Sequence, residues 1–114
     1  GVAHHEHFLT ERVVNVPNES VRELWAPRYG LVALTCRGDP TLSGIAYVQT
    51  MDGLRCGPIA GLSFVRFRIG APSPASITGF LTMLADDGRL WLQNRTGREL
   101  EITYTIMGAP WSDA

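Results

Sequence analysis

The N-terminal residues His4-His5-Glu6-His7 form the one cluster of metal-ligand side chains in the sequence. His5 and His7 are two positions apart, so in a β-strand both imidazoles would point to the same face. Two nitrogens do not complete a tetrahedral or octahedral shell, and a single chain is therefore expected to bind no metal or other cofactor here. A symmetric trimer would supply six nitrogens from three such pairs. The alternative is a solvated chain end.

The residues that usually perform catalysis are sparse and badly placed. The sequence lacks the hydrolase nucleophile motif and a glycine-rich loop followed by lysine. Glu99 and Glu101 share one strand face, while Asp86 and Asp87 lie in a turn, and neither pair predicts two carboxylates facing each other across a cleft. We therefore expect a protein that binds or assembles, and not an enzyme.

Tryptophan and arginine offer better candidates for a binding surface. Trp91 alternates with leucines and shares its strand face with Arg89 and Gln93, which suggests an exposed or interfacial patch. Aromatic residues with arginine are typical of interface hot spots, and aromatic residues with amides also stack on sugars. We take Trp91, Arg89 and Trp111 as candidate interface or glycan contacts. The alternative for Trp91 is that it packs under a loop.

Two short motifs have ordinary structural explanations. Arg37-Gly38-Asp39 is the tripeptide of cell-adhesion ligands, but with the following proline it is also a good turn sequence. Asn18-Glu19-Ser20 and Asn94-Arg95-Thr96 are glycosylation sequons. Sequons matter only in a eukaryotic secretory pathway, and no export signal is visible, so turn roles are favoured.

Length and charge narrow the class of protein. A chain of 114 residues fits one domain, 1–114, with flexible arms expected at 1–7 and 109–114. Ten basic residues, all arginine, are mixed with eleven acidic ones for a net charge of −1, which argues against nucleic-acid binding. No apolar run is long enough to insert in a membrane.

Cys36 and Cys56 allow a single internal disulfide. In an oxidising compartment they would join two strands, and in a cytosol they would be small buried hydrophobic residues. The missing export signal favours the second alternative.

Alternation of apolar and polar residues dominates the chain and predicts β-strands. Leu100 to Met107, Val65 to Ile69 and the stretch around Leu90 and Leu92 each have one apolar face. Apolar residues occupy both faces of three other stretches, which indicates strands that are more deeply buried: Tyr29 to Cys36, Ile45 to Met51 and Ile77 to Leu84. Phe8 to Val16 and a short strand around Ser20 to Ala26 complete the set. Together these patterns predict an all-β, antiparallel β-sandwich or jelly roll of about seven to eight strands.

Turn residues separate these strands. Asp52-Gly53 and Asp86-Asp87-Gly88 predict hairpins, because glycine tolerates a positive φ. Asn94-Arg95-Thr96-Gly97 is expected to join the last two strands in the same way. Gly38-Asp39-Pro40 and Ala71-Pro72-Ser73-Pro74 are expected to be loops, since proline cannot donate to a sheet ladder.

Three segments, taken in order, resemble small β-sandwich proteins on tailed-bacteriophage particles. They are Val21 to Val32 with its Ala-Pro-x-x-Gly turn, Asp86 to Leu92, and the closing stretch from Asn94 to Gly108. These are sandwich-building patterns, so no binding residue is carried over from that group.

The resemblance implies a virion structural protein, either a capsid decoration (cement) protein or a tail accessory protein. Such a protein would be made in the host cytoplasm, assemble as a homo-oligomer with the trimer as the expected state, and dock on major capsid or tail proteins. The alternative is a carbohydrate-binding or receptor-binding module that contacts a host surface glycan.

Overall fold

The computed structural model describes residues 10–74 and 78–109 of the chain. Nine strands and no helix are found within these ranges. In chain order they are β1 (Thr10–Val16), β2 (Ser20–Leu24), β3 (Tyr29–Cys36), β4 (Asp39–Gln49), β5 (Arg55–Gly61), β6 (Val65–Ile69), β7 (Leu81–Asp86), β8 (Arg89–Asn94) and β9 (Leu100–Gly108). The predicted all-β class is confirmed.

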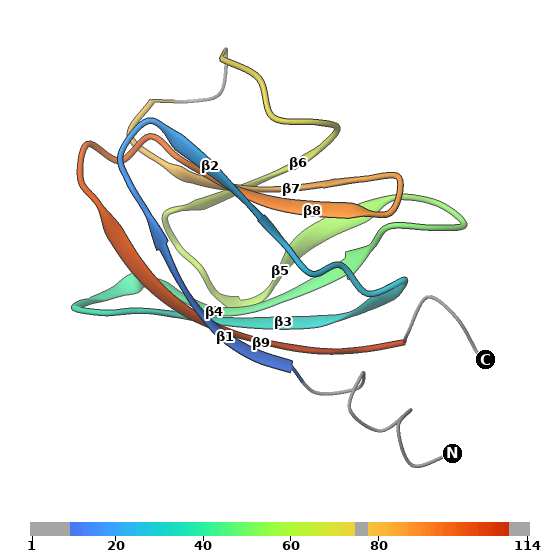
Figure 1. Cartoon of the computed structure of the whole chain (residues 1–114). Coiled ribbons are helices and arrows are strands. Elements are labelled where there is room, and N and C mark those ends of the chain that lie inside the picture. Colours follow the sequence, from blue (N-terminus) through green and yellow to red (C-terminus); the bar gives the residue numbers. More distant parts are fainter. Residues whose placement is uncertain (1–9, 75–77, 110–114) are drawn as a thin grey trace.

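The strands form two sheets packed face to face, which Figure 1 shows as two layers. Sheet A has five strands in the order β1-β9-β3-β4-β5, and sheet B has four in the order β2-β8-β7-β6. Consecutive strands change sheet between β1 and β2, between β2 and β3, between β5 and β6, and between β8 and β9. The architecture is therefore the predicted β-sandwich.

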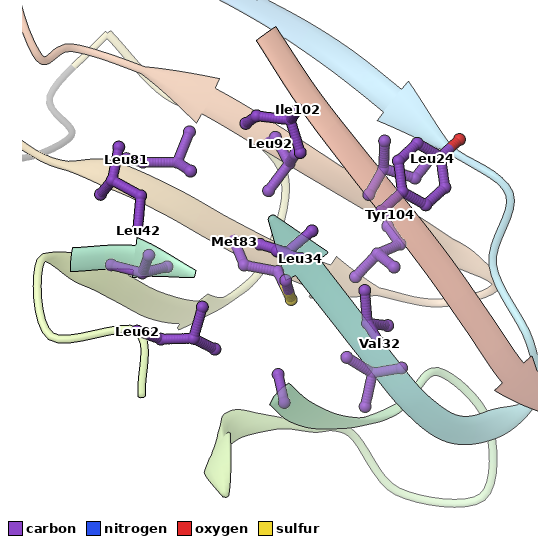
Figure 2. Close-up of a cluster of buried hydrophobic side chains, with 14 of the residues drawn as sticks. Leu24, Val32, Leu34, Leu42, Leu62, Leu81, Met83, Leu92, Ile102 and Tyr104 are labelled. Carbon is purple, nitrogen blue, oxygen red and sulfur yellow. The ribbon is translucent and has the colours of Figure 1, made fainter. Parts of the chain in front are cut away.

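The two sheets enclose one hydrophobic core, drawn in Figure 2. Alternate residues of each strand point inward, as the period of two requires. Sheet A contributes among others Val32, Leu34, Ile102 and Tyr104, and sheet B contributes Leu81, Met83 and Leu92. The loops add Leu62, which is 3% exposed although its φ is +59°.

The strand count exceeds the expected seven or eight because β5 was not predicted. Pro58, Gly57 and Gly61 disguise this strand, since proline and glycine are depleted in sheets. The structure tolerates them because β5 lies at the edge of sheet A, where one side of the strand has no ladder to complete. Pro40 was predicted to lie in a loop with Gly38 and Asp39, but it is the second residue of β4.

The chain departs from a purely antiparallel sandwich at one place. β6 and β7 pair in parallel, with Val65 opposite Leu81 and Ile69 opposite Ala85. A parallel pair cannot be joined by a tight hairpin, so the connection must pass along the length of the strands. Residues 70–74, the described part of this connection that follows β6, lie on the side of sheet B that faces away from the core (Figure 1), and we call them the crossing loop.

The predicted hairpins are confirmed at two places and wrong at a third. Asp86 pairs with Arg89 around Gly88, whose φ is +72°, and residues 50–54 join β4 to β5. The segment Asn94 to Gly97 does not form a hairpin, because β8 lies in sheet B and β9 in sheet A. Four hydrogen bonds of the fully buried Asn94 side chain stabilise this corner instead, with Val16, Thr96 and Arg98 as partners.

Candidate functional site

The outer side of sheet A carries apolar and hydroxyl side chains across its three central strands. Their inward residues are buried and the intervening ones point outward. We call this outward set the sheet A face; its members are Tyr29, Leu31, Ala33 and Thr35 of β3, Ile45 and Tyr47 of β4, and Thr103, Thr105 and Met107 of β9.

The members of the sheet A face form continuous rows across the strands. Met107 lies opposite Leu31, which in turn lies opposite Tyr47. The next row joins Thr105, Ala33 and Ile45. Side chains in such rows touch their neighbours, which is why Leu31 and Tyr47 are half-buried although nothing described covers them. Met107 remains 53% exposed and Ile45 38% exposed.

Charged residues flank this face. Glu11 on the edge strand β1 is exposed and lies opposite Thr105. Glu101 stands at the start of β9, within 3.6 Å of Arg37, and Arg55 stands on the edge strand β5. None of the nine members of the sheet A face is charged. A neutral, partly apolar surface of this kind is typical of a contact face and unlike a solvated one.

The edge strands differ in how well they are protected against pairing with another chain. β5 contains Pro58 and pairs with β4 through a register shift, β6 carries exposed Arg66 and Arg68, and β2 is only five residues long. β1 has seven residues with no proline, glycine or register shift, and its Val13 is 65% exposed. The protection of β1 comes from the exposed charges of Glu11 and Arg12, so each of the four edges has at least one protecting feature.

Trp91 faces away from the core, as its alternation with Leu90 and Leu92 predicted, but it is not exposed. Its side chain is 6% accessible, and Leu84, its register partner on β7, is 2% accessible. The expectation that Trp91 lies in an exposed patch is therefore wrong. Its role as a contact for a partner or glycan stays a prediction that would require the covering residues to move.

The cover over Trp91 comes from the same chain. The guanidinium carbon of Arg89 lies 4.9 Å from the centre of the Trp91 ring, and Arg89 donates two hydrogen bonds, of 3.0 and 2.7 Å, to Glu23. Farther along the same face, the Gln93 side chain donates to the carbonyl of Ser73 in the crossing loop, at 2.9 Å. The alternative considered for Trp91, packing within the domain, agrees better with this geometry. The ion pair also lowers the pKa of Glu23, because Arg89 hydrogen-bonds to its charged form.

The aromatic and arginine pairing expected around Trp91 occurs in exposed form elsewhere. The Phe64 and Phe80 rings stack with centres 6.3 Å apart, and the guanidinium carbon of Arg66 lies 3.9 Å from the centre of the Phe80 ring. Phe64 is 53% exposed. The sequence did not reveal this cluster, because Phe64 and Phe80 lie 16 positions apart and meet only through the parallel pairing of β6 and β7.

The Arg37-Gly38-Asp39 tripeptide forms the tight turn between β3 and β4, and its carboxylate is occupied. Asp39 pairs with Arg98 and accepts hydrogen bonds from the backbone and hydroxyl of Thr41. These contacts lower the pKa of Asp39, with the hydroxyl of Thr41 as the largest cause. Its side chain is 16% exposed, so the tripeptide does not present a free carboxylate.

The two cysteines are free thiols. Cys36 is buried in the hydrophobic core, and the partly buried Cys56 packs against that core from β5. Burial raises the pKa of both thiols, that of Cys56 to about 12. Because the thiolate is the reactive form, neither cysteine is suited to nucleophilic chemistry.

The two sequons differ in whether a glycan could be attached to their asparagine. Asn94 is fully buried with its amide hydrogen-bonded, so a folded chain could not carry a glycan there. Asn18 is exposed in the turn between β1 and β2, where its side chain accepts a hydrogen bond from the backbone of Gly97. The turn interpretation fits both residues.

The remaining sequence candidates, His5, His7 and Trp111, lie outside the described residues. Within residues 10–74 and 78–109, no three histidine, cysteine or acidic side chains gather where they could hold a metal ion. No helix in these ranges is long and apolar enough to cross a membrane. Ala109, which was assigned to the C-terminal arm, is instead held by backbone hydrogen bonds to Arg28 and Tyr29.

A comparison with protein-family models, curated proteins and solved structures finds no match to this chain. The two outer faces and the pockets of the sandwich are therefore the features of this chain that bear on its function.

Proposed function

We propose that the chain is a structural protein of a tailed-bacteriophage virion, a capsid decoration or tail accessory protein, and not an enzyme. It would assemble as a homo-oligomer, with the trimer as the expected state, and dock on capsid or tail proteins. The virion setting rests on the resemblance of three sequence segments. The assembly rests on one structural observation, the uncovered sheet A face.

That observation is a mismatch between the sequence of β3 and its surroundings. β3 has apolar side chains on both faces, with Val32 and Leu34 inward and Leu31 and Ala33 outward. Such two-sided apolar strands are typical of sheets that are covered on both sides. The core covers the inward side, while Tyr29, Ile45 and Met107 on the outward side are 51%, 38% and 53% exposed. A partner surface is the natural cover for the outward side.

A second copy of this chain is the partner that the charge pattern favours. The nine members of the sheet A face are uncharged, so two copies can approach at these positions without opposing like charges. The edge strand β1, whose Val13 is 65% exposed, borders the same sheet and can extend the contact. Contact between two identical faces gives a dimer, whereas contact between this face and a different patch gives a trimer or larger ring.

Substitution of one residue on each sheet tests this proposal. Met107→Glu places a carboxylate within the sheet A face, and Phe64→Glu places one at an equally exposed position near sheet B. We expect light scattering on a sizing column to show an oligomer for the wild-type chain and for Phe64→Glu, and a monomer for Met107→Glu. Thermal unfolding must show that both variants remain folded.

Two results would contradict the assembly proposal. One is a wild-type monomer at every concentration up to the millimolar range. The other is dissociation by Phe64→Glu but not by Met107→Glu, which would move the contact to the Phe64–Phe80 cluster. The virion setting is tested separately, by mass spectrometry of particles purified from the producing host. The chain should be present there in many copies per particle, and its absence would refute that part.

The alternative function, a carbohydrate-binding module, draws no support from Trp91. A sugar-stacking platform needs an exposed ring, and this ring lies beneath Arg89. A glycan contact through Trp91 would require Arg89 to move off the ring.

A further inference from the structure

An open pocket of about 390 Å³ lies where the crossing loop meets β2 and β8. The crossing loop that forms one wall rises from the outer side of sheet B in Figure 1. The lining residues are Glu19, Val21, Pro72, Pro74, Gln93 and Arg95, together with Ser73. Its volume falls in the range of small-ligand sites in proteins.

The Gln93 side chain supplies an unused hydrogen-bond acceptor at this pocket. Its Nε2 donates to the carbonyl of Ser73 at 2.9 Å, which determines the orientation of the amide, because the flipped amide would oppose two oxygens. Oε1 is buried and has no hydrogen-bond partner, and the residue is 7% exposed. A buried acceptor without a donor is costly, so a ligand that supplies a hydroxyl or N–H to Oε1 gains affinity.

The charges at the pocket rim cancel. Glu19 and Arg95 approach within 3.3 Å, and Arg95 also donates to the carbonyl of Pro74 at 2.6 Å. Because Glu19 and Arg95 compensate each other, they offer an ionic ligand no net attraction, and the loss of its hydration goes uncompensated. The pocket therefore selects against ligands with a net charge.

Apolar side chains line two sides of the pocket. Val21 lies opposite Gln93 in the β2–β8 ladder, and the rings of Pro72 and Pro74 line the loop side. These surfaces suit the C–H face of a ring better than a flexible chain. We propose that the pocket binds a neutral ligand that carries hydroxyl groups on a compact ring, which is the chemistry of an uncharged sugar residue.

Binding must be coupled to a small movement of the loop. Oε1 is buried in the free chain, so a donor reaches it only when the Gln93 amide or residues 72–74 shift. At least two hydrogen bonds hold residues 73 and 74, one from Gln93 to the carbonyl of Ser73 and one from Arg95 to the carbonyl of Pro74, and a shift of the loop must break or stretch them. This site uses no member of the sheet A face, and its failure would leave the assembly proposal untouched.

Titration of the ¹⁵N-labelled chain with monosaccharides tests the proposal. We expect glucose, galactose or N-acetylglucosamine to shift the side-chain amide of Gln93 and the backbone amide of Ser73, with a dissociation constant in the millimolar range. Glucosamine and N-acetylneuraminic acid, which carry opposite charges, should bind at least about tenfold more weakly. Absence of shifts at Gln93 with all three neutral sugars would overturn the proposal, as would preference for either charged sugar.

Three variants separate pocket binding from other causes. Val21→Phe fills the pocket while leaving the Gln93–Ser73 hydrogen bond in place, and should abolish the sugar-induced shift at Ser73. Val13→Phe makes the same substitution on an exposed edge strand of sheet A and should bind normally. Gln93→Met keeps the side-chain volume but removes the acceptor, and should weaken binding at least about tenfold. Undiminished binding to Val21→Phe or to Gln93→Met would overturn the proposal.

Discussion

Strands β3 and β7 have similar patterns of apolar residues but different surroundings. Both carry apolar residues on both faces, and both were expected to be buried on both sides. In β7 the first five residues are all buried, including Leu84 on the outward side. In β3 the outward residues are half-buried or exposed. The comparison shows that the same apolar pattern is satisfied within the chain in sheet B and left open in sheet A.

The connections between strands explain the difference. The parallel pair β6 and β7 requires a long connection, and the crossing loop within it lies against the outer side of sheet B, where it bonds to Gln93. In sheet A, short hairpins join β3 to β4 and β4 to β5, whereas β9 follows β8 of the other sheet. A hairpin covers no sheet face. Within the described residues, Tyr29, Ile45 and Met107 on the outer side of sheet A stay exposed.

Truncation of one side chain on each outer face should give the largest contrast in stability. Trp91→Ala removes a buried aromatic ring and should lower the free energy of unfolding by about 3–5 kcal/mol. Met107→Ala removes a side chain that is half exposed and should change it by about 0.5 kcal/mol or less in the monomer. Urea titrations at low protein concentration measure both. Equal losses of unfolding free energy in the two variants would mean that the outer faces of the two sheets are buried to the same extent.

Thiol reactivity tests whether sheet A closes the core although its outer face is bare. With a pKa of about 12, Cys56 is a thiolate in only about one molecule in 10⁴ at pH 8, against about one in four for an ordinary thiol. Native chain should therefore react with a disulfide reagent at least about a hundredfold more slowly than chain in denaturant. Fast reaction of one equivalent in the native state would show that the β5 edge opens.

The smallest effect is expected from the ion pair above Trp91. Arg89 lowers the pKa of Glu23, so the stabilisation by this pair is complete above the ordinary glutamate pKa and is lost as pH falls through the lowered value. Arg89→Gln should return the pKa of Glu23 toward its ordinary value, as measured by NMR titration of the carboxyl carbon. Both groups are exposed, so the pH-dependent stability difference should be small. An unchanged Glu23 pKa would show that Arg89 does not stay over Trp91 in solution.

Local patterns predicted much of the fold and little of the candidate site. β3 and β6 begin and end at the residues predicted, because alternation and flanking turns are local properties. β5 was missed because Pro58 is acceptable only at a sheet edge, and edge position depends on the whole strand order. The Phe64–Phe80 stack and the pocket beside Gln93 depend on the path of the crossing loop, which no local pattern indicates.

The sequence by itself determined that this protein is a β-sandwich, since a period of two with turn residues between the strands leaves few alternatives. It also determined that β3 and β7 need cover on both faces. Only the tertiary structure decided which of them receives that cover from its own chain. The physical reason is that cover comes from connections between distant strands, and their course depends on strand order and direction, which side-chain periodicity does not specify.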